Sequence, residues 1–298
     1  MKNRLLFLRI FIMVIFIGCS PEIVTNFQFE NPTLIIKKIK VEKPLSDTIG
    51  GFVMNFDEKG RPINYTSLDE TSVFREFVYG NNQQLESLYF YGTQTITYNY
   101  LYSDGRLSEQ SGENLSGQTT QIFYYNDITV QSVLFNNEIY SSTNFFTFEN
   151  EERTRLIEIK TYDGGGVLKH HYLFDYDENN NVIKETHYID SPVDDTLILF
   201  STIEQTFDDR NNPLKNSDHF RWMEAWYLSH NESNTFIENI SRHSLNNIVS
   251  RTSTNQFGIS SHQTFDYQYN NFNYPISATR LTNGEFEQRN YTFTYHED

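Results

Sequence analysis

Apolar and polar side chains alternate with a period of two residues along most of this chain. Between residues 96 and 103 the two sets are Ile96, Tyr98, Tyr100 and Tyr102 on one side, and Thr97, Asn99 and Ser103 on the other. Such alternation is typical of antiparallel strands with one buried and one solvated face. It predicts strands from about residue 33 onward. We expect the buried face to carry Tyr100, Tyr102, Phe174 and Tyr176, and the other face Thr97 and Asn99.

An aromatic residue followed closely by Asp or Asn recurs every 23 residues. The strict copies are Phe56, Tyr79, Tyr102, Tyr125 and Phe148, and looser copies are Tyr176, Phe207, Tyr269 and Tyr295. A fixed period indicates one supersecondary unit stacked on itself. Two strands and two turns fill one period, which predicts about sixteen to twenty strands in total.

These patterns predict an all-β fold, an antiparallel meander of hairpin repeats over residues 33–298. Open twisted sheets rarely exceed about ten strands, so we expect a long curved sheet or an incomplete barrel. Thr, Asn, Gln and Glu occupy the alternate face, where a lipid-facing barrel needs an apolar band. The strands are therefore predicted to face water.

One stretch, residues 217–228, breaks the strand pattern and predicts a short helical insert. Phe220, Met223, Trp226 and Tyr227 fall on one helical face, with Ser217 or Asp218 as the cap. One interpretation is a plug for the core of the sheet. The other is an aromatic platform for a sugar ring or apolar ligand, with Trp222, Trp226 and Tyr227 as the candidate binding residues.

The N-terminus has the features of an export signal. Basic residues at positions 2 and 4 precede an apolar run, residues 10–17, that is too short to span a bilayer. Gly18 and Cys19 follow, and they resemble the lipobox of bacterial lipoproteins. The resemblance implies a signal peptide over residues 1–18, a lipidated Cys19 and a tether over residues 19–32. A cleaved signal with a coincidental cysteine is the alternative.

The formal net charge of −16 restricts the partners. A chain without a basic stripe cannot neutralise a phosphate backbone, so we expect no nucleic acid partner. The expected partners are the membrane, through the N-terminal lipid, and a glycan or an envelope protein.

The segment from Phe174 to Ile183 reads Phe-Asp-Tyr-Asp-Glu-Asn-Asn-Asn-Val-Ile and resembles the YD repeats of RHS-type proteins. Similar elements are Asp208 to Asn216, containing Asn-Asn-Pro, and Asn246 to Val249. Residues 46–296 are similar to small YD-repeat lipoproteins of Gram-negative bacteria. The resemblance implies a porin-like or open β-barrel sheet and anchoring to the outer membrane, on its periplasmic or surface side. Large RHS proteins enclose a toxin, and no toxin domain is expected here.

Motifs of catalysis are not found in the sequence. It has no Gly-x-Ser-x-Gly, His-Glu-x-x-His or P-loop pattern. His170 and His171 are adjacent, so a strand would direct them to opposite faces, where they cannot share a metal. We expect no enzyme and no cofactor, and interpret the chain as a non-catalytic scaffold or binding module of the envelope. The alternatives are a component of an RHS-like secretion or toxin-associated system, and a carboxylate-dependent glycan-active enzyme.

No metal site is predicted, and the only candidate is a set of alternate oxygen-bearing residues, Asp175, Asp177, Asn179 and Asn181. Their spacing resembles that of calcium ligands in an EF-hand loop. Asn180 replaces the glycine of that loop and Thr186 replaces its bidentate Glu, and a hairpin turn explains the same residues. Two tripeptides resemble O-glycan acceptors, Asp47-Thr48-Ile49 and Asp195-Thr196-Leu197.

Overall fold

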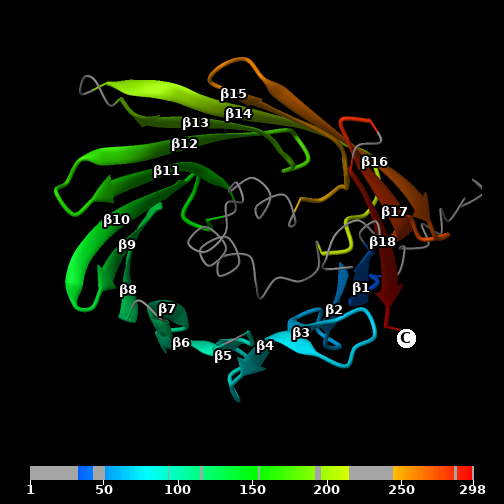
Figure 1. Ribbon diagram of the computed structural model, residues 1–298, viewed down its shortest axis with the longest axis horizontal. Coiled ribbons are helices and arrows are strands. Elements are labelled where there is room, and N and C mark those ends of the chain that lie inside the picture. Colours follow the sequence, from blue (N-terminus) through cyan, green and yellow to red (C-terminus); the bar gives the residue numbers. More distant parts are fainter. Residues whose placement is uncertain are drawn as a thin grey trace, which may run out of the picture. The chain divides into compact units, whose positions relative to one another are not determined.

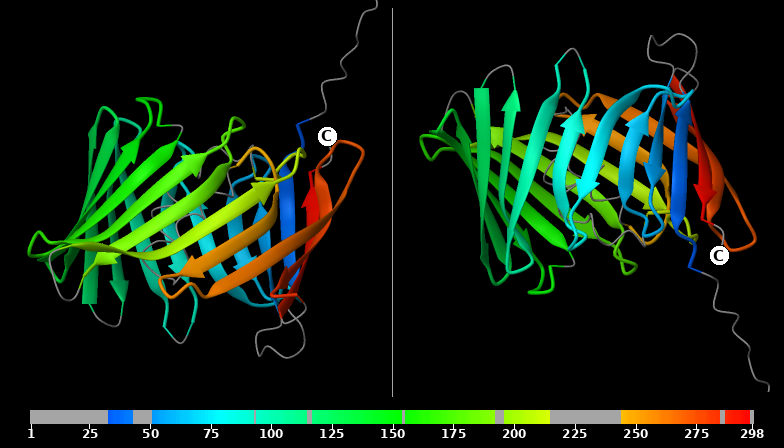
Figure 2. Two further views of the ribbon diagram at one scale, coloured as in Figure 1. Left: turned by 90° about the horizontal axis from the view of Figure 1, so that it is seen from above. Right: turned by 90° about the horizontal axis from the view of Figure 1, so that it is seen from below.

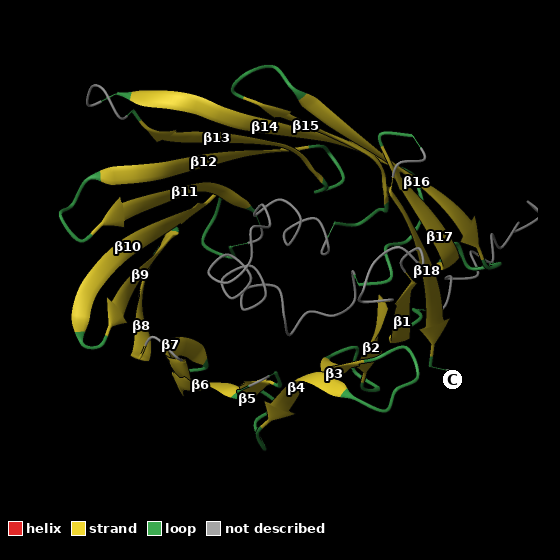
Figure 3. Ribbon diagram, viewed as in Figure 1, coloured by secondary structure: helices red, strands yellow, loops and turns green. Residues whose placement is uncertain are grey.

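The computed structural model describes residues 33–42, 51–92, 94–114, 117–153, 155–191, 196–214, 244–284 and 287–296. They all belong to one compact unit, Thr33–Asp298. Strands and loops make up this part of the chain, and no helix occurs in it (Figure 3). Among the same residues, no helix is long and apolar enough to cross a bilayer.

The described residues form 18 strands. Their bounds are β1 Ile36–Glu42, β2 Gly51–Phe56, β3 Pro62–Thr66, β4 Val73–Tyr79, β5 Leu85–Phe90, β6 Ile96–Ser103, β7 Arg106–Asn114, β8 Gly117–Asn126, β9 Thr129–Asn136, β10 Ile139–Phe148, β11 Leu156–Asp163, β12 Leu168–Tyr176, β13 Val182–Asp190, β14 Leu197–Phe207, β15 Ile248–Asn255, β16 Ser260–Tyr269, β17 Pro275–Thr282 and β18 Glu287–Tyr295. The predicted all-β meander and its number of strands are confirmed.

The sheet is a closed barrel, and the prediction of an open sheet or incomplete barrel is wrong. Each strand pairs antiparallel with the next, and β1 pairs with both β2 and β18 (Figure 1). At this seam Ile39 lies opposite Phe293, and Val41 lies opposite Tyr291. Closure leaves the sheet without an edge strand, which removes the unpaired backbone groups that an open sheet exposes. The predicted helical insert, residues 217–228, lies outside the described residues.

Each repeat aromatic stands at or next to the end of an even-numbered strand, so one 23-residue period is a pair of strands. Phe56 ends β2, Tyr79 ends β4 and Phe148 ends β10. In an up-and-down meander, all turns from even to odd strands lie at one end of the barrel. We call this end the repeat rim, and the other end the opposite rim. Figure 2 shows the turns gathered at the two ends.

The turns after Phe56, Tyr176 and Tyr269 share one construction, which explains the Asp or Asn that follows these aromatics. Asp57 Oδ1 accepts hydrogen bonds from the backbone N–H of Lys59 and of Arg61, each 2.9 Å long. Asp177 Oδ1 accepts equivalent bonds from residues 179 and 181. The third residue after each aspartate has a positive φ, 74° at Gly60 and 62° at Asn180. Only glycine and asparagine adopt this conformation at low cost.

The two faces of the barrel differ in burial as the alternation predicts. Tyr100 and Phe174 are buried, and Tyr102 and Tyr176 are half-buried against the same core. On the other face Thr97 is half-buried and Asn99 is exposed. The described residues form a single layer, so only the concave face can bury side chains against one another. We therefore assign the buried face to the inside. Most of the inner core is one cluster of apolar side chains that extends from Phe77 on β4 to Ile203 on β14.

Candidate functional site

The inner face carries a chain of buried amides and hydroxyls, which we call the inner polar belt (Gln121, Ser132, Asn144 and Thr161). Gln121 Nε2 donates to Ser132 Oγ (2.8 Å), and Asn144 Nδ2 donates to the same oxygen (3.2 Å). Thr161 Oγ1 donates to Asn144 Oδ1 at 2.7 Å. The belt thus crosses β8, β9, β10 and β11 perpendicular to the strands. Buried polar groups are costly unless they are hydrogen-bonded, and here they bond to one another.

Two histidines continue the belt on β12 and β13. His170 Nδ1 and His187 Nε2 are 3.1 Å apart, and the His187 ring stacks on Tyr172 with a centroid distance of 4.0 Å. Burial, together with the nearby His170, lowers the pKa of His187 to about 4. Burial likewise lowers the pKa of His170. Both histidines are therefore neutral near pH 7 and present hydrogen-bonding groups without charge.

A set of half-buried rings lines the inner face of β16 and β18. We call it the aromatic wall (Phe265, Tyr267, Tyr291 and Phe293). Phe265 stacks on Tyr267 with a centroid distance of 6.3 Å, and Tyr291 stacks on Phe293 at 6.5 Å. Between the two strands, Ala278 of β17 lies in register with both Tyr267 and Tyr291. Because Ala278 is small, the rings of β16 and β18 form most of the inner surface at this place.

The outer face carries polar ladders on several strands, while others, such as β4 with Phe74 and Val78, expose apolar side chains. On β11 and β12, Glu158 Oε1 lies 2.8 Å from Lys160 Nζ and 2.8 Å from His171 Nε2. Thr206 and Ser250 place their hydroxyls 2.6 Å apart. All described outer positions of β16 and β18 are polar: Ser260, His262, Thr264, Asp266 and Gln268 on β16, and Gln288, Asn290, Thr292 and Thr294 on β18. These two strands therefore lack the apolar outer band of a lipid-facing barrel.

At the repeat rim, tyrosine hydroxyls connect one repeat to the strand before it. Tyr79 donates to the carbonyl of Pro62 (3.0 Å), Tyr176 to Leu156 (2.9 Å) and Tyr295 to Pro275 (2.7 Å). In each case the acceptor is the first residue of the preceding odd-numbered strand. The repeated tyrosine therefore joins neighbouring strands by a hydrogen bond. This structural role explains the spacing, and no ligand is needed to account for it.

Arginines cover several of these rings on the same rim. The guanidinium carbon of Arg61 lies 4.3 Å from the Tyr79 centroid, and that of Arg155 lies 5.6 Å from Tyr176. Tyr125 differs because two arginines lie over it, Arg106 and Arg153, each at 5.4 Å. Burial raises the pKa of Tyr125 to about 12, although the two arginines act to lower it.

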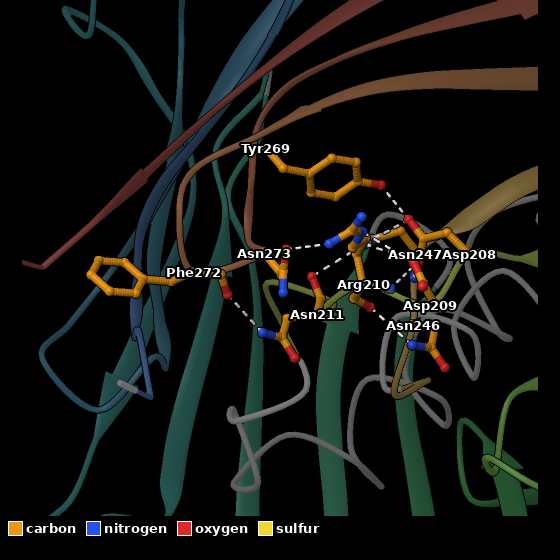
Figure 4. Close-up of polar contacts among 9 residues, drawn as sticks. All are labelled: Asp208, Asp209, Arg210, Asn211, Asn246, Asn247, Tyr269, Phe272 and Asn273. Atoms are coloured by element: carbon orange, nitrogen blue, oxygen red, sulfur yellow. Dashed lines mark hydrogen bonds and ion pairs between the residues drawn. The ribbon is translucent and has the colours of Figure 1, made fainter. Parts of the chain in front are cut away.

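The most connected polar cluster of the rim centres on Asp208 (Figure 4). Its Oδ1 accepts from the backbone N–H of Arg210 and of Asn247, each at 3.0 Å, and its Oδ2 accepts from the hydroxyl of Tyr269. Asn246 N donates to Asn181 Oδ1 (3.1 Å), which connects the cluster to the neighbouring turn. Segments 208–214 and 244–247 are thereby held together. The cluster is explained as the anchor of two chain segments, and its acceptors are already used.

The sequence-predicted site residues divide into two groups. Cys19, Trp222, Trp226 and Tyr227 lie outside the described residues, as does the tripeptide at residues 47–49. In the calcium candidate, Asp177 uses both carboxylate oxygens within its own turn, because Oδ2 accepts from Asn181 Nδ2 at 2.8 Å. Asp175 is exposed and lies opposite Lys184 on the neighbouring strand. These residues therefore form a hairpin turn.

The two adjacent histidines lie on opposite faces, as predicted. His170 contacts His187 inside, and His171 contacts Glu158 outside. Among the described residues, no group of three or more His, Cys, Asp or Glu side chains could hold a metal ion. Sequence reasoning did not identify the inner polar belt, the aromatic wall as a surface, or the paired arginines. Their members come from different strands, and only the register brings them together.

No protein-family profile matches the sequence, and no curated protein matches it. Among solved structures, a porin-like protein from Bacteroides vulgatus has 10% identity and a TM-score of 0.43, with 89% of this chain and 100% of that chain covered. A porin-like protein from Bacteroides uniformis has 12% identity and a TM-score of 0.36, with 89% and 98% covered. A structure described as TcdB2-TccC3-TEV has 12% identity and a TM-score of 0.20, and the match covers 79% of this chain but 15% of that one. At these values, function has to be argued from the barrel itself.

Proposed function

We propose that this chain is a non-catalytic, lipid-anchored protein of the bacterial envelope whose barrel binds a saccharide on its inner face. The observation that carries the proposal is the aromatic wall on the inside of β16 and β18. Flat rings pack against the apolar face of a sugar, and neighbouring amides and hydroxyls bond to its hydroxyl groups. Tyr267 and Tyr291 carry hydroxyl groups within the wall itself.

The polar outer face supports a barrel that stands in water and is tethered to the membrane by its N-terminus. A lysine or arginine on the lipid-facing side of a barrel costs about 2–4 kcal/mol near the middle of the bilayer. Lys160 lies in the middle of β11, opposite Phe145 and His171, and forms an ion pair with Glu158. Such a pair is unremarkable in water. Lipidation of Cys19, the resemblance to YD-repeat lipoproteins and the outer-membrane location belong to this proposal.

The distribution of carboxylates favours binding over catalysis. Glycoside hydrolysis ordinarily uses two carboxyl groups on either side of the scissile bond. Among the described residues, Glu185 is the one buried carboxylate. It faces inward on β13, where its cross-strand partners are Phe174 and Ile203.

The test is a carbohydrate array probed with the wild-type chain and with Phe265→Ala. Phe265 belongs to the aromatic wall but to neither buried core cluster, so its truncation should leave the fold intact. We expect the wild type to bind at least one polysaccharide and Phe265→Ala to lose about tenfold in affinity, as for one lost stacking contact. The matched control is Thr264→Ala, the neighbouring residue on the outer face, which should bind as the wild type does.

Absence of any saccharide bound by the folded wild-type chain contradicts the proposal. So does equal binding by Phe265→Ala and Thr264→Ala, because the ligand would then lie away from the aromatic wall. Thermal unfolding of each variant confirms that a loss of binding reports on the surface and not on the fold.

A further inference from the structure

At the repeat rim, an arginine that lies over a tyrosine ring also forms an ion pair with a carboxylate, except at Tyr125. Arg61 over Tyr79 forms an ion pair with Asp57, Arg155 over Tyr176 with Glu149 (3.3 Å), and Arg210 over Tyr269 with Asp209 (3.1 Å). Tyr125 has two guanidinium groups over its ring. Within the described part of the chain, neither Arg106 nor Arg153 forms an ion pair with a carboxylate.

Arg153 is fixed in place. Its Nη2 donates to the carbonyls of Asn126 (3.1 Å) and Asp127 (3.0 Å), and its backbone has a φ of 54°. Its Nε is buried and has no hydrogen-bond acceptor among the described residues. A residue other than glycine adopts this φ at a cost, which persists where the surroundings hold the residue for another purpose.

The electrostatics of the pair are unfavourable as the structure stands. Burial lowers the pKa of Arg153, and the neighbouring charge of Arg106 lowers it further. Asp127 and Glu151 raise the pKa of Arg153, but neither forms an ion pair with it. Two cations therefore lie over one tyrosine ring of an acidic chain with net charge −16, and neither has an ion-paired carboxylate among the described residues. An added anion would remove this repulsion.

We infer that Arg106, Arg153 and Tyr125 form an oxyanion site that takes the carboxylate or sulfate group of an acidic saccharide. Guanidinium groups bind such groups through paired N–H donors, and a ring beneath them holds their planes in position. The inference rests on the proposed saccharide function for the identity of the ligand. It adds that the preferred saccharide is charged, and it places the charged group on the repeat rim at β7, β8 and the β10–β11 turn.

The test is calorimetric titration of the full chain with polygalacturonate and with its neutral methyl ester, at constant ionic strength. Sodium sulfate, titrated against sodium chloride, is the small probe of the same site. The variant is Arg106→Gln, because Arg106 is exposed and has no hydrogen bond among the described residues that the fold could lose. The matched control is Lys59→Gln, which removes the same charge from an exposed residue of the same rim.

We expect the wild type to prefer polygalacturonate over its ester and to bind sulfate saturably. Arg106→Gln should lower the affinity for polygalacturonate and for sulfate by about tenfold each, the loss typical of one charge-assisted hydrogen-bonding group. Arg106→Lys should recover part of the binding, and Lys59→Gln should change neither ligand.

The outcomes separate this inference from the proposed function. If Arg106→Gln retains the full preference for polygalacturonate, or if Lys59→Gln weakens binding equally, the oxyanion site is wrong while saccharide binding stands. If sulfate binds but polygalacturonate and its ester bind equally, the site does not select acidic saccharides and the inference is overturned. If Phe265→Ala binds every saccharide as the wild type does while Arg106→Gln loses sulfate, the oxyanion site stands and the proposed inner-face site fails.

Discussion

At the scale of single residues, the repeated tyrosine is explained by its hydroxyl as much as by its ring. The ring of Tyr176 packs against the inner core, and its hydroxyl donates to the carbonyl of Leu156. Phenylalanine can satisfy the first role and not the second. At Phe56 and Phe148 the repeat uses phenylalanine, so the packing role is general and the hydrogen bond is an addition at particular copies.

The separate roles of ring and hydroxyl predict that Tyr176→Phe lowers the stability of the protein measurably. The variant keeps the packed ring and removes one hydrogen bond of 2.9 Å, so the free energy of unfolding should fall by about 1 kcal/mol. Urea denaturation followed by circular dichroism measures it. Tyr124→Phe is the control, because Tyr124 is 54% exposed on the outer face. An equal effect of the two substitutions would show that the Leu156 bond contributes nothing.

His187 predicts a pH dependence at the same scale. Its folded-state pKa of about 4 lies below the usual value of 6.5, so the unfolded chain binds the proton more readily. Stability from this residue is fully present above pH 6.5 and is lost as pH falls from 6.5 toward 4. Between pH 7 and pH 5, the free energy of unfolding should therefore decrease less for His187→Gln than for the wild type, as measured by denaturation at both pH values. His262→Gln, on the outer face, is the control, and a decrease as large as that of the wild type in His187→Gln would refute the assignment.

At the scale of elements, the sequence predicts the strands well because the alternation is local. Each strand has its own aromatic row, and each turn of the repeat rim has its own Asp or Asn. Closure is different, because it depends on β1 meeting β18, whose residues are about 250 positions apart in the chain. Neither strand carries a local signal for the other. The inner polar belt and the arginine pair cannot be predicted locally for the same reason, because the register of four or more strands assembles each of them.

The seam between β1 and β18 gives a direct test of closure. Lys40 and Thr292 lie opposite each other on the outer face. In a Cys19→Ala background, the double substitution Lys40→Cys with Thr292→Cys should form a disulfide on mild oxidation, because directly opposed residues have closely spaced Cβ atoms. Altered mobility in a non-reducing gel reports the bond.

The control for the seam is Lys40→Cys with Gln268→Cys, which places the second cysteine on β16, two strands further from β1. This pair should remain reduced. If both pairs behave alike, or if the opposed pair stays reduced while the protein is folded, β1 and β18 are not neighbours in solution and the barrel is open.

At the scale of the whole molecule, the two faces of the barrel determine where it can reside. The described outer positions of β16 and β18 are polar, and the aromatic rings between them in sequence point inward. Apolar residues also occur on the outer face, as at Leu101, which is 56% exposed. Others are exposed on β14, where Leu197, Ile198, Leu199 and Phe200 follow one another. Exposed apolar residues occur on proteins in water, whereas charged ladders are costly in lipid. The proposed association with the membrane is through the N-terminal lipid and not through the barrel wall.

This assignment predicts the fate of Cys19→Ala. Without the acyl chains, which contribute about 0.8 kcal/mol for each buried methylene, the protein should leave the membrane fraction and remain folded in buffer without detergent. Fractionation of cells, followed by circular dichroism of the aqueous fraction, measures both properties. The wild type, labelled metabolically with palmitate, should stay with the membranes and carry the label. A variant that still sediments with membranes at the mature mass, and unfolds or aggregates when detergent is removed, would place the barrel wall itself in lipid. In that case both parts of the proposal would be wrong, the lipid tether and the aqueous surroundings of the barrel.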